Sequence, residues 1–155
     1  MEKIRIDDVE SYMGPADVKR PLTDALDATD VALNYYELAP GDSFAFGYHA
    51  HEDQEEVFYV QSGTVTFETA DDPVTVAAGE AIRFAPGEFQ RGVNEDDERV
   101  VALAIGAPRD SGETEVRCHC EDCGERTPND IEMTEDRDAL VTRCVVCGAV
   151  TDRFD

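Results

Sequence analysis

Hydrophobic residues along the middle of this chain come in short runs separated by turn residues. From residue 31 to residue 105 the runs are rich in Val, Phe, Tyr and Ile, and Gly, Pro, Asn or Asp stand between them. Short runs of this kind, without a long stretch of helical periodicity, predict β-strands joined by turns. The predicted strands are 31–38, 44–51, 56–61, 65–69, 74–76, 81–84, 89–93 and 100–105. Eight short strands predict an all-β fold, either a sandwich or a small barrel.

The sequence on either side of this region has a different character. Residues 1–30 are less regular: Gly14-Pro15 marks a turn, and 21–28 fits one helical turn. The segment 107–113, APRDSGE, predicts a linker. We therefore expect an N-terminal extension at 1–30 that packs on a β-domain at 31–106. The linker would then lead to a small separate unit at 114–155.

Two of the three histidines, His49 and His51, lie two residues apart on a predicted strand. Residues two apart share one face of a strand, so both imidazoles should enter the same space. Glu55 and Glu56 follow after a polar turn. Two imidazoles and one carboxylate, with positions left open, are the ligands of mononuclear iron and similar first-row metal sites. A bare His-x-His pair also occurs as two surface histidines on a hairpin, but the glutamate and the turn glycine Gly63 favour the metal interpretation.

The spacing of these residues resembles the first motif of the cupin family. Four residues separate His51 from Glu56, and six separate Glu56 from Gly63. By this count Glu56, and not Glu55, is the carboxylate ligand. One departure is that seven residues lie between Gly41 and His49, where the family has five. The resemblance implies a double-stranded β-helix, a jelly-roll barrel with a ligand cavity, with an unrelated β-sandwich as the alternative.

The second cupin motif is incomplete in this sequence. Gly79, Gly87 and Asn94 stand at positions that match it, but Gln90 stands where the family has a third histidine. A neutral amide oxygen is a weaker ligand than imidazole, and three strong ligands suffice for an open site. Gln90 is then either a fourth ligand or a hydrogen-bonding neighbour of the site. The resemblance implies a divalent ion in the barrel, Fe, Mn, Ni or Zn.

Strand alternation extends the predicted site to the walls of a cavity. Residues on the same strand face as the two histidines, or as Glu56, should point inward with them. Arginines near the second motif would bind a carboxylate or phosphate of a small-molecule ligand, or pair with neighbouring acids. The candidates are Ala45, Gly47, Phe58, Val60, Arg83 and Arg91, with Tyr35, Tyr36 and Phe89 either at the mouth or in the core.

Four cysteines form the one internal repeat, Cys120-x-x-Cys123-Gly and Cys144-x-x-Cys147-Gly, with 20 residues between the inner cysteines. Each glycine permits a tight turn, and the two turns supply four thiolates for tetrahedral zinc. The pattern resembles a zinc ribbon, with a hairpin formed by 131–134 and 139–143. The ending CGAVTDRFD also resembles the second knuckle of rubredoxin, which leaves iron as an alternative.

Two further residues of the C-terminal unit offer donor atoms. Cys118 and His119 lie directly before Cys120, and either of them is an alternative ligand to it. We expect Cys118 to be a spare thiol.

The formal net charge is −23, from 36 acidic and 13 basic residues, and Lys3 and Lys19 are the only lysines. This charge argues against binding to nucleic acid or to an anionic membrane. The acidic residues are spread along the whole chain, a composition that resembles proteins of extreme halophiles and implies a haloarchaeal type of source. No stretch is long and apolar enough to span a bilayer, and the start is not a secretion signal. Metal-type cysteine spacing agrees with a reducing cytoplasm.

Three functional hypotheses follow from these features. The first is a metal-dependent cupin that acts on a small organic molecule, as a dioxygenase-like oxidoreductase or an isomerase. The second is a non-enzymatic module that senses a ligand or metal and contacts a protein partner through its ribbon. The third is a metal-free dimer scaffold. In each case we expect a homodimer formed by the barrel, since an open sheet edge invites pairing.

The charge predicts a steep dependence of stability on salt. At about 0.1 M salt the Debye length is about 10 Å, and at about 1 M it is about 3 Å, so repulsion among the carboxylates is screened only at high salt. We expect the melting temperature, measured by circular dichroism, to climb from dilute buffer to molar KCl. A flat profile would remove the halophilic interpretation.

Overall fold

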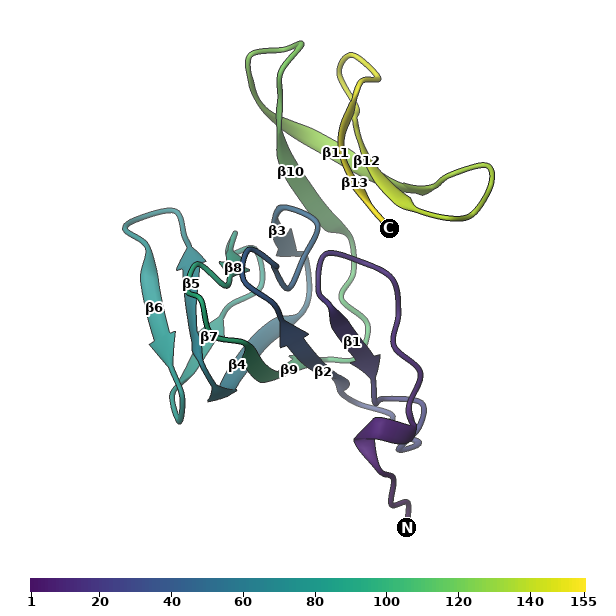
Figure 1. Cartoon of the computed structure of the whole chain (residues 1–155), viewed down its shortest axis with the longest axis vertical. Helices are drawn as coiled ribbons and strands as arrows, with labels where there is room; N and C mark the ends of the chain where they lie inside the picture. Colours follow the sequence, from purple (N-terminus) through teal and green to yellow (C-terminus); the bar gives the residue numbers. More distant parts are fainter.

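The computed structural model describes all 155 residues, and β-strands make up almost all of its regular structure (Figure 1). The elements are η1 (Ile6–Asp8), β1 (Val18–Pro21), β2 (Ala32–Leu38), β3 (Tyr48–His51), β4 (Glu55–Ser62), β5 (Thr64–Glu68), β6 (Val74–Ala77), β7 (Ala81–Phe84), β8 (Arg91–Val93), β9 (Val100–Ala107), β10 (Thr114–Cys120), β11 (Glu125–Met133), β12 (Leu140–Cys144) and β13 (Val150–Phe154). The only helical element is the three-residue turn η1, and no helix is long and apolar enough to cross a membrane.

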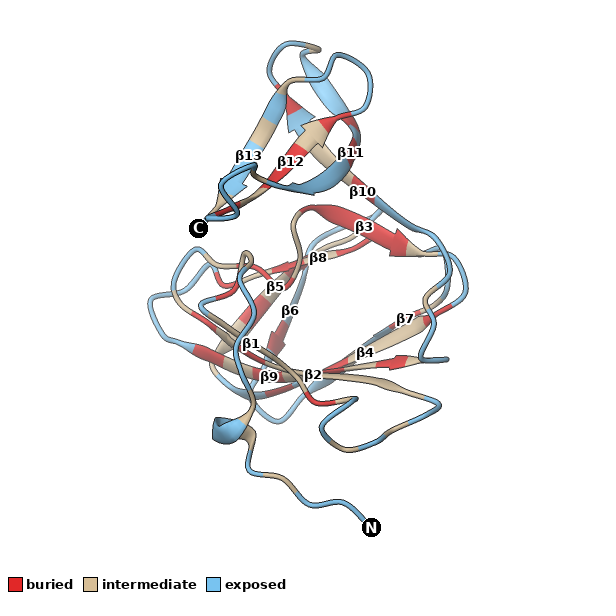
Figure 2. Ribbon diagram, turned by 90° about the vertical axis from the view of Figure 1, so that its right-hand side faces the viewer, coloured by how far each residue is buried: buried red, intermediate tan, exposed pale blue.

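The strands β1 to β9 form the double-stranded β-helix that the sequence predicted. One layer is a five-stranded sheet in the order β1-β2-β9-β4-β7, and the facing layer contains the sheet β6-β5-β8 together with β3 (Figure 2). A bridge between His49 and Gln90 joins β3 to the segment that leads into β8. The cavity of the barrel therefore lies between two layers whose facing side chains are set by strand alternation.

The core fills the space between the two layers. On β9 the burial alternates strictly, with Val100, Ala102 and Ala104 turned inward, as expected for a sheet with one buried face. Phe44 and Phe58 meet at 4.8 Å between ring centroids in the same core. The buried cluster also contains Ala16, Tyr36, Leu38, Val60, Val65, Phe67, Val76 and Phe84.

All eight predicted barrel strands are present, but the strand predicted at 44–51 begins only at Tyr48. Phe44 N donates to Gly92 O and His49 N donates to Gln90 O, so four residues on one side oppose a single residue on the other. The extra residues form a large bulge. Because of this bulge, strand alternation does not hold before Tyr48. Ala45 still lines the cavity beside the histidines, whereas Gly47 packs against β10.

The sequence analysis missed strand β1 in the N-terminal segment. β1 pairs with the outer edge of β2, and Lys19 lies opposite Tyr36 in this pairing. Its four residues, Val-Lys-Arg-Pro, contain two charges and a proline, which is typical of an edge strand and gives no alternating pattern. The segment 21–28, predicted as one helical turn, contains a hydrogen-bonded turn, with Leu26 N donating to Leu22 O at 3.0 Å.

The four C-terminal strands form one antiparallel sheet that continues into the barrel. The order β13-β12-β11-β10-β3 shows that β10 pairs directly with the strand that carries the two histidines. Arg117 and Arg126 lie over the rings of Phe89 and Tyr48, at 4.2 and 4.6 Å from the ring centroids. Backbone pairing and cation–π contacts thus join the C-terminal sheet to the barrel.

The hairpin predicted within the C-terminal unit is confirmed. β11 pairs with β12 so that Ile131 lies opposite Thr142 and Met133 lies opposite Leu140. β11 is longer than predicted, because its first half, from Glu125, pairs with β10.

The contact between barrel and C-terminal sheet leads to a test at Gly47. A Cβ added there would lie 2.8 Å from Arg117 O and 2.8 Å from Cys118 Sγ, so Gly47→Ala should force β10 away from the bulge. We expect a loss of about 1–3 kcal/mol in the free energy of unfolding, measured by urea denaturation.

Gly14→Ala is the matched control. The nearest atom to an added Cβ at Gly14 is Phe46 Cζ at 3.5 Å, an ordinary contact. Equal stability of the two variants would mean that the barrel and β10 do not depend on this close approach.

Candidate metal centres

The structure brings His49, His51 and Glu56 together inside the barrel. His49 Nε2 lies 3.8 Å from Glu56 Oε2, and His51 Nε2 lies 3.5 Å from the same oxygen. The three ligand atoms all lie within 4.8 Å of one another. β3 supplies both imidazoles and β4 supplies the carboxylate, so two separate strands converge on one point.

Hydrogen bonds on the far side of each ring turn the Nε2 atoms toward this point. His49 Nδ1 donates to Gly47 O at 3.1 Å, and His51 Nδ1 lies 2.8 Å from the hydroxyl oxygen of Thr114. An imidazole whose Nδ1 carries the proton presents a lone pair at Nε2, which is how metal-binding histidines are held in proteins.

The carboxylate of Glu56 is held in its charged form. Burial acts to raise its pKa, but the hydrogen bonds and charges of His49 and His51 outweigh burial and bring the pKa down to about 2. The centre therefore presents a charged carboxylate at neutral pH.

The donor set fits a first-row metal ion. Ligand atoms at about 2.1 Å from one ion lie about 3.0 Å apart at a right angle and about 3.4 Å apart at the tetrahedral angle. The separations from Glu56 Oε2, 3.5 and 3.8 Å, are slightly wider. A small inward movement of the side chains would bring all three atoms into bonding range.

Gln90 closes the fourth side of this group. Its Nε2 donates to Glu56 Oε2 at 3.1 Å and lies 3.2 Å from His49 Nε2, while its buried Oε1 has no hydrogen-bond partner. Rotation of the amide by half a turn would place Oε1 among the donor atoms, where a cation or an imidazole N–H would stabilise it next to a carboxylate. The orphaned oxygen is a second observation that fits a cation at this point.

A cavity of about 330 Å³ opens beside the histidines and Glu56. Two of the six candidate wall residues, Ala45 and Phe58, line it, and so does Tyr36. The other candidates lie elsewhere. Gly47 packs against β10, Val60 is fully buried in the core, Arg83 pairs with Glu55 outside the barrel, and Arg91, Tyr35 and Phe89 do not line this cavity.

Several cavity residues were missed by the sequence analysis. Lys19 and Asn34 reach the cavity from β1 and β2, and Arg109 reaches it from the segment after β9. Thr114 contacts His51 from 63 positions away in the sequence. For Lys19 the rarity of lysine was a usable signal, whereas nothing local to Thr114 indicates its contact.

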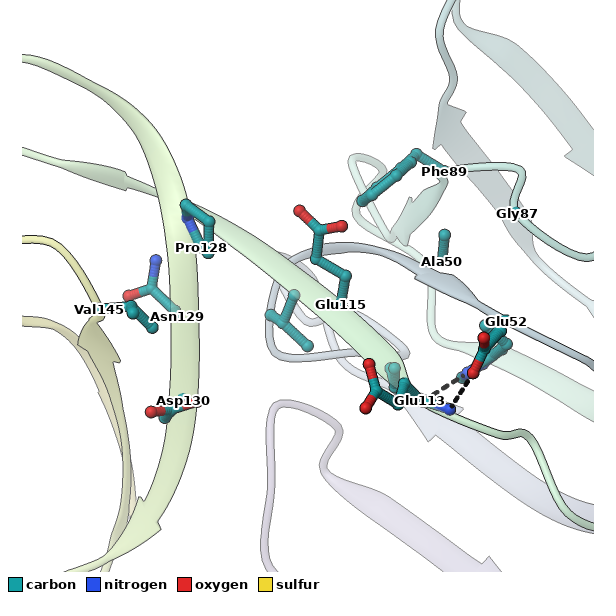
Figure 3. A pocket seen from close by; sticks show the side chains of 13 residues that line it. Ala50, Glu52, Gly87, Phe89, Glu113, Glu115, Pro128, Asn129, Asp130 and Val145 are labelled. Carbon is teal, nitrogen blue, oxygen red and sulfur yellow. Dashed lines mark hydrogen bonds between the residues drawn. The ribbon is translucent and has the colours of Figure 1, made fainter.

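A second, shallower hollow lies between the barrel and the C-terminal sheet (Figure 3). Ala50 and Phe89 line it on the barrel side, and Pro128 and Val145 line it on the other side. The acidic residues at its rim are Glu52, Glu113, Glu115 and Asp130. Glu113 N donates to Glu52 Oε2 at 3.2 Å, so this hollow marks the junction of the two parts.

The four cysteines form a second candidate metal centre. Cys120 Sγ lies 3.5 Å from Cys147 Sγ, and Cys123 Sγ lies 3.9 Å from Cys144 Sγ. Sulfurs around one tetrahedral zinc lie about 3.8 Å apart, so the cluster is consistent with a small zinc-binding unit. A hydrogen bond from Thr127, at 3.1 Å, is the main cause that lowers the pKa of Cys144 to about 6, and it favours the thiolate that a metal requires.

The two knuckles have the same backbone form. Gly124 N donates to Cys120 O at 2.8 Å, and Gly148 N donates to Cys144 O at 2.9 Å. Both glycines have a positive φ, which explains why each repeat ends in glycine.

Cys118 and His119 lie outside the cysteine cluster. Cys118 Sγ donates to Phe46 O at 3.6 Å, and burial raises the pKa of its thiol. His119 is exposed on β10. Cys120 therefore belongs to the cluster, and neither Cys118 nor His119 does.

Solved structures with the same fold come from several organisms. A conserved double-stranded β-helix protein from Klebsiella pneumoniae is 18% identical, with a TM-score of 0.61, over 75% of this chain and 96% of that one. A sugar phosphate isomerase of the cupin superfamily from Silicibacter pomeroyi is 22% identical, with a TM-score of 0.59, over 96% and 91% of the two chains. A recombinant oxalate oxidase in complex with glycolate is 15% identical, with a TM-score of 0.58, over 71% and 60%. At these identities the likeness shows the fold.

No curated protein sequence matches the chain. The model of the cupin domain matches residues 34–106, the segment that contains both histidines, Glu56 and Gln90. Together with the double-stranded β-helix described above, this match identifies residues 34–106 as a cupin domain, and the four-cysteine cluster lies near the C-terminus of the chain.

Proposed function

We propose that this protein binds a divalent first-row metal ion at His49, His51 and Glu56 and uses that centre to bind or convert a small organic molecule. The observation that carries the proposal is the convergence of three donor atoms beside a cavity of about 330 Å³. The four-cysteine cluster would hold zinc and stabilise the small C-terminal unit.

Each residue of the barrel centre has a defined task in this proposal. His49 and His51 would bind the ion through Nε2, and Glu56 would supply the negative charge that offsets part of the charge of the ion. Such an ion supplies Lewis acidity and open coordination positions for a ligand. The aromatic walls, Phe44 and Phe58 among them, would exclude water from the bound molecule.

The similar solved structures leave the reaction open. One is described as a sugar phosphate isomerase and another as an oxalate oxidase, so the same barrel carries different chemistries.

One observation favours the second candidate, a sensing module without catalysis. β10 carries Thr114, which contacts His51, at one end and the candidate zinc ligand Cys120 at the other. A rigid strand that touches both centres would transmit a change at the barrel centre to the ribbon and to a protein partner bound there.

The metal proposal is tested by the metal content of variants. We expect His51→Ala to lose the barrel metal, because the ion would keep only two strong ligands. Gln90→Ala should retain most of it, since a neutral amide contributes less than imidazole. The measurement is elemental analysis of protein purified without chelators at high salt.

The cysteine cluster supplies the internal control. Zinc bound by the four cysteines should be the same in both variants, so a loss confined to one metal equivalent identifies the barrel. If Gln90→Ala empties the barrel as completely as His51→Ala, Gln90 is a full ligand. If the wild-type chain carries only the zinc of the cysteine cluster, the proposal is wrong.

The hydrogen bond from β10 to the barrel centre is tested at Thr114. Thr114→Val removes the acceptor for His51 Nδ1, and we expect the affinity of the barrel for its metal to fall by about tenfold. Competition with a chromophoric chelator measures this affinity.

Thr114→Ser is the conservative control because it keeps the hydroxyl. Thr114→Ser should keep most of the wild-type affinity for the metal, because the hydroxyl that His51 contacts is retained. Equal affinities in Thr114→Val and wild type would show that His51 does not depend on this contact for its orientation.

A further inference from the structure

Lys19 is placed in the barrel cavity by the register of β1 on β2. In this pairing Lys19 lies directly opposite Tyr36, which is 5% exposed and lines the cavity. Residues directly opposite each other in an antiparallel pair share a face, so the Lys19 side chain points inward with Tyr36. Its neighbour Arg20, opposite Tyr35, points away and donates to the backbone oxygens of Asp7 and Val9.

The ammonium group of Lys19 has no partner within the chain. No carboxylate lies within ion-pair distance of it and it makes no side-chain hydrogen bond, and its closest aromatic contact is the ring of Tyr36, with the centroid at 5.8 Å. The other cation of the cavity, Arg109, is already paired with Asp24 and donates to Ala28 O. Lys19 is therefore the one free positive charge that faces the cavity.

This arrangement costs free energy unless something binds the ammonium. Burial lowers the pKa of Lys19, and the charge of Glu56 partly opposes that effect. A cation bound by Glu56 would cancel this opposing charge and leave two positive groups facing one cavity. Lys19 is half-buried and lines the cavity, so a ligand in the cavity is the group that would supply the missing partner.

We propose that Lys19 binds the carboxylate of the small molecule that occupies the barrel cavity, and that this molecule is an organic acid with an apolar body. The proposal rests on the proposed function for the location of the ligand and adds its chemical class. One unpaired ammonium matches a singly charged headgroup, whereas a phosphate dianion usually meets several donors.

The remaining walls of the cavity define the other end of the ligand. Tyr36, Phe44, Phe46 and Phe58 line it, and the first two meet edge to face with their centroids 5.0 Å apart. Aromatic walls of this kind favour a flat or apolar molecule. Benzoate combines a carboxylate with such a body and is the probe for the experiment.

Three probes of similar shape separate the effects of charge and headgroup. Benzoate is compared with benzamide, its neutral analogue, and with phenyl phosphate, which carries the other anionic headgroup. Binding is measured by two-dimensional NMR titration of the full-length protein loaded with zinc, at one fixed KCl concentration. This method reads weak affinities and shows which residues the probe contacts.

The variants are Lys19→Met, which keeps the apolar stem, and Lys19→Gln as a second substitution in case the first does not fold. Lys3→Met is the matched control, because Lys3 is the only other lysine and is exposed. We expect the dissociation constant for benzoate to rise about tenfold or more in both Lys19 variants. It should be unchanged in Lys3→Met, and the constant for benzamide should be unchanged in all variants.

Several results would overturn the proposal. The first is that benzoate binds the Lys19 variants as tightly as it binds the wild-type chain. The second is that the wild-type chain binds benzoate no more tightly than benzamide. The third is that the wild-type chain does not bind benzoate. A larger effect of Lys19→Met on phenyl phosphate than on benzoate would assign the lysine to phosphate and overturn the carboxylate class.

Metal analysis of the same samples separates this inference from the proposed function. A barrel without metal that still distinguishes benzoate from benzamide through Lys19 would refute the metal centre alone. A barrel with metal that does not distinguish them would refute the role of Lys19 alone.

Discussion

The arrangement of the barrel centre depends on how the short strand β3 is held. One edge of β3 pairs with β10, and its other edge is bridged to Gln90 before β8. These two neighbours determine the positions of His49 and His51 and also contact their rings, through Thr114 and through the Gln90 amide. An isolated strand of four residues would not hold the two histidines in fixed positions. Pairing along both edges of β3 fixes its backbone and therefore the positions of the donor atoms.

The same pairing joins the two candidate metal centres into one structure. β10 runs from Thr114, which contacts His51, to Cys120, so one strand reaches both candidate centres. The division into barrel, linker and ribbon stays a prediction, but the hydrogen-bonded sheet does not stop at the linker. Arg117 and Arg126 strengthen the junction, because each stacks on an aromatic ring of the barrel.

Positive charge is distributed unequally between the surface and the cavity. Seven arginines pair with carboxylates at exposed sites, where ion pairs contribute little to stability. Lys19 has no such pair and lies in the cavity beside the candidate metal ligands. In a chain with a net charge of −23, an unpaired lysine in an aromatic cavity says more about function than the exposed ion pairs do.

The sequence by itself determined the features that depend on local spacing. These are the eight barrel strands, the donor set of His49, His51 and Glu56, and the two cysteine knuckles, because alternation and short motifs lie within a few residues of one another. Tertiary structure decided the bulge before Tyr48, the strand that carries Lys19, and the contact from Thr114 to His51. Each of these depends on backbone pairing between segments far apart in the chain, and pairing of this kind leaves no pattern in either segment alone.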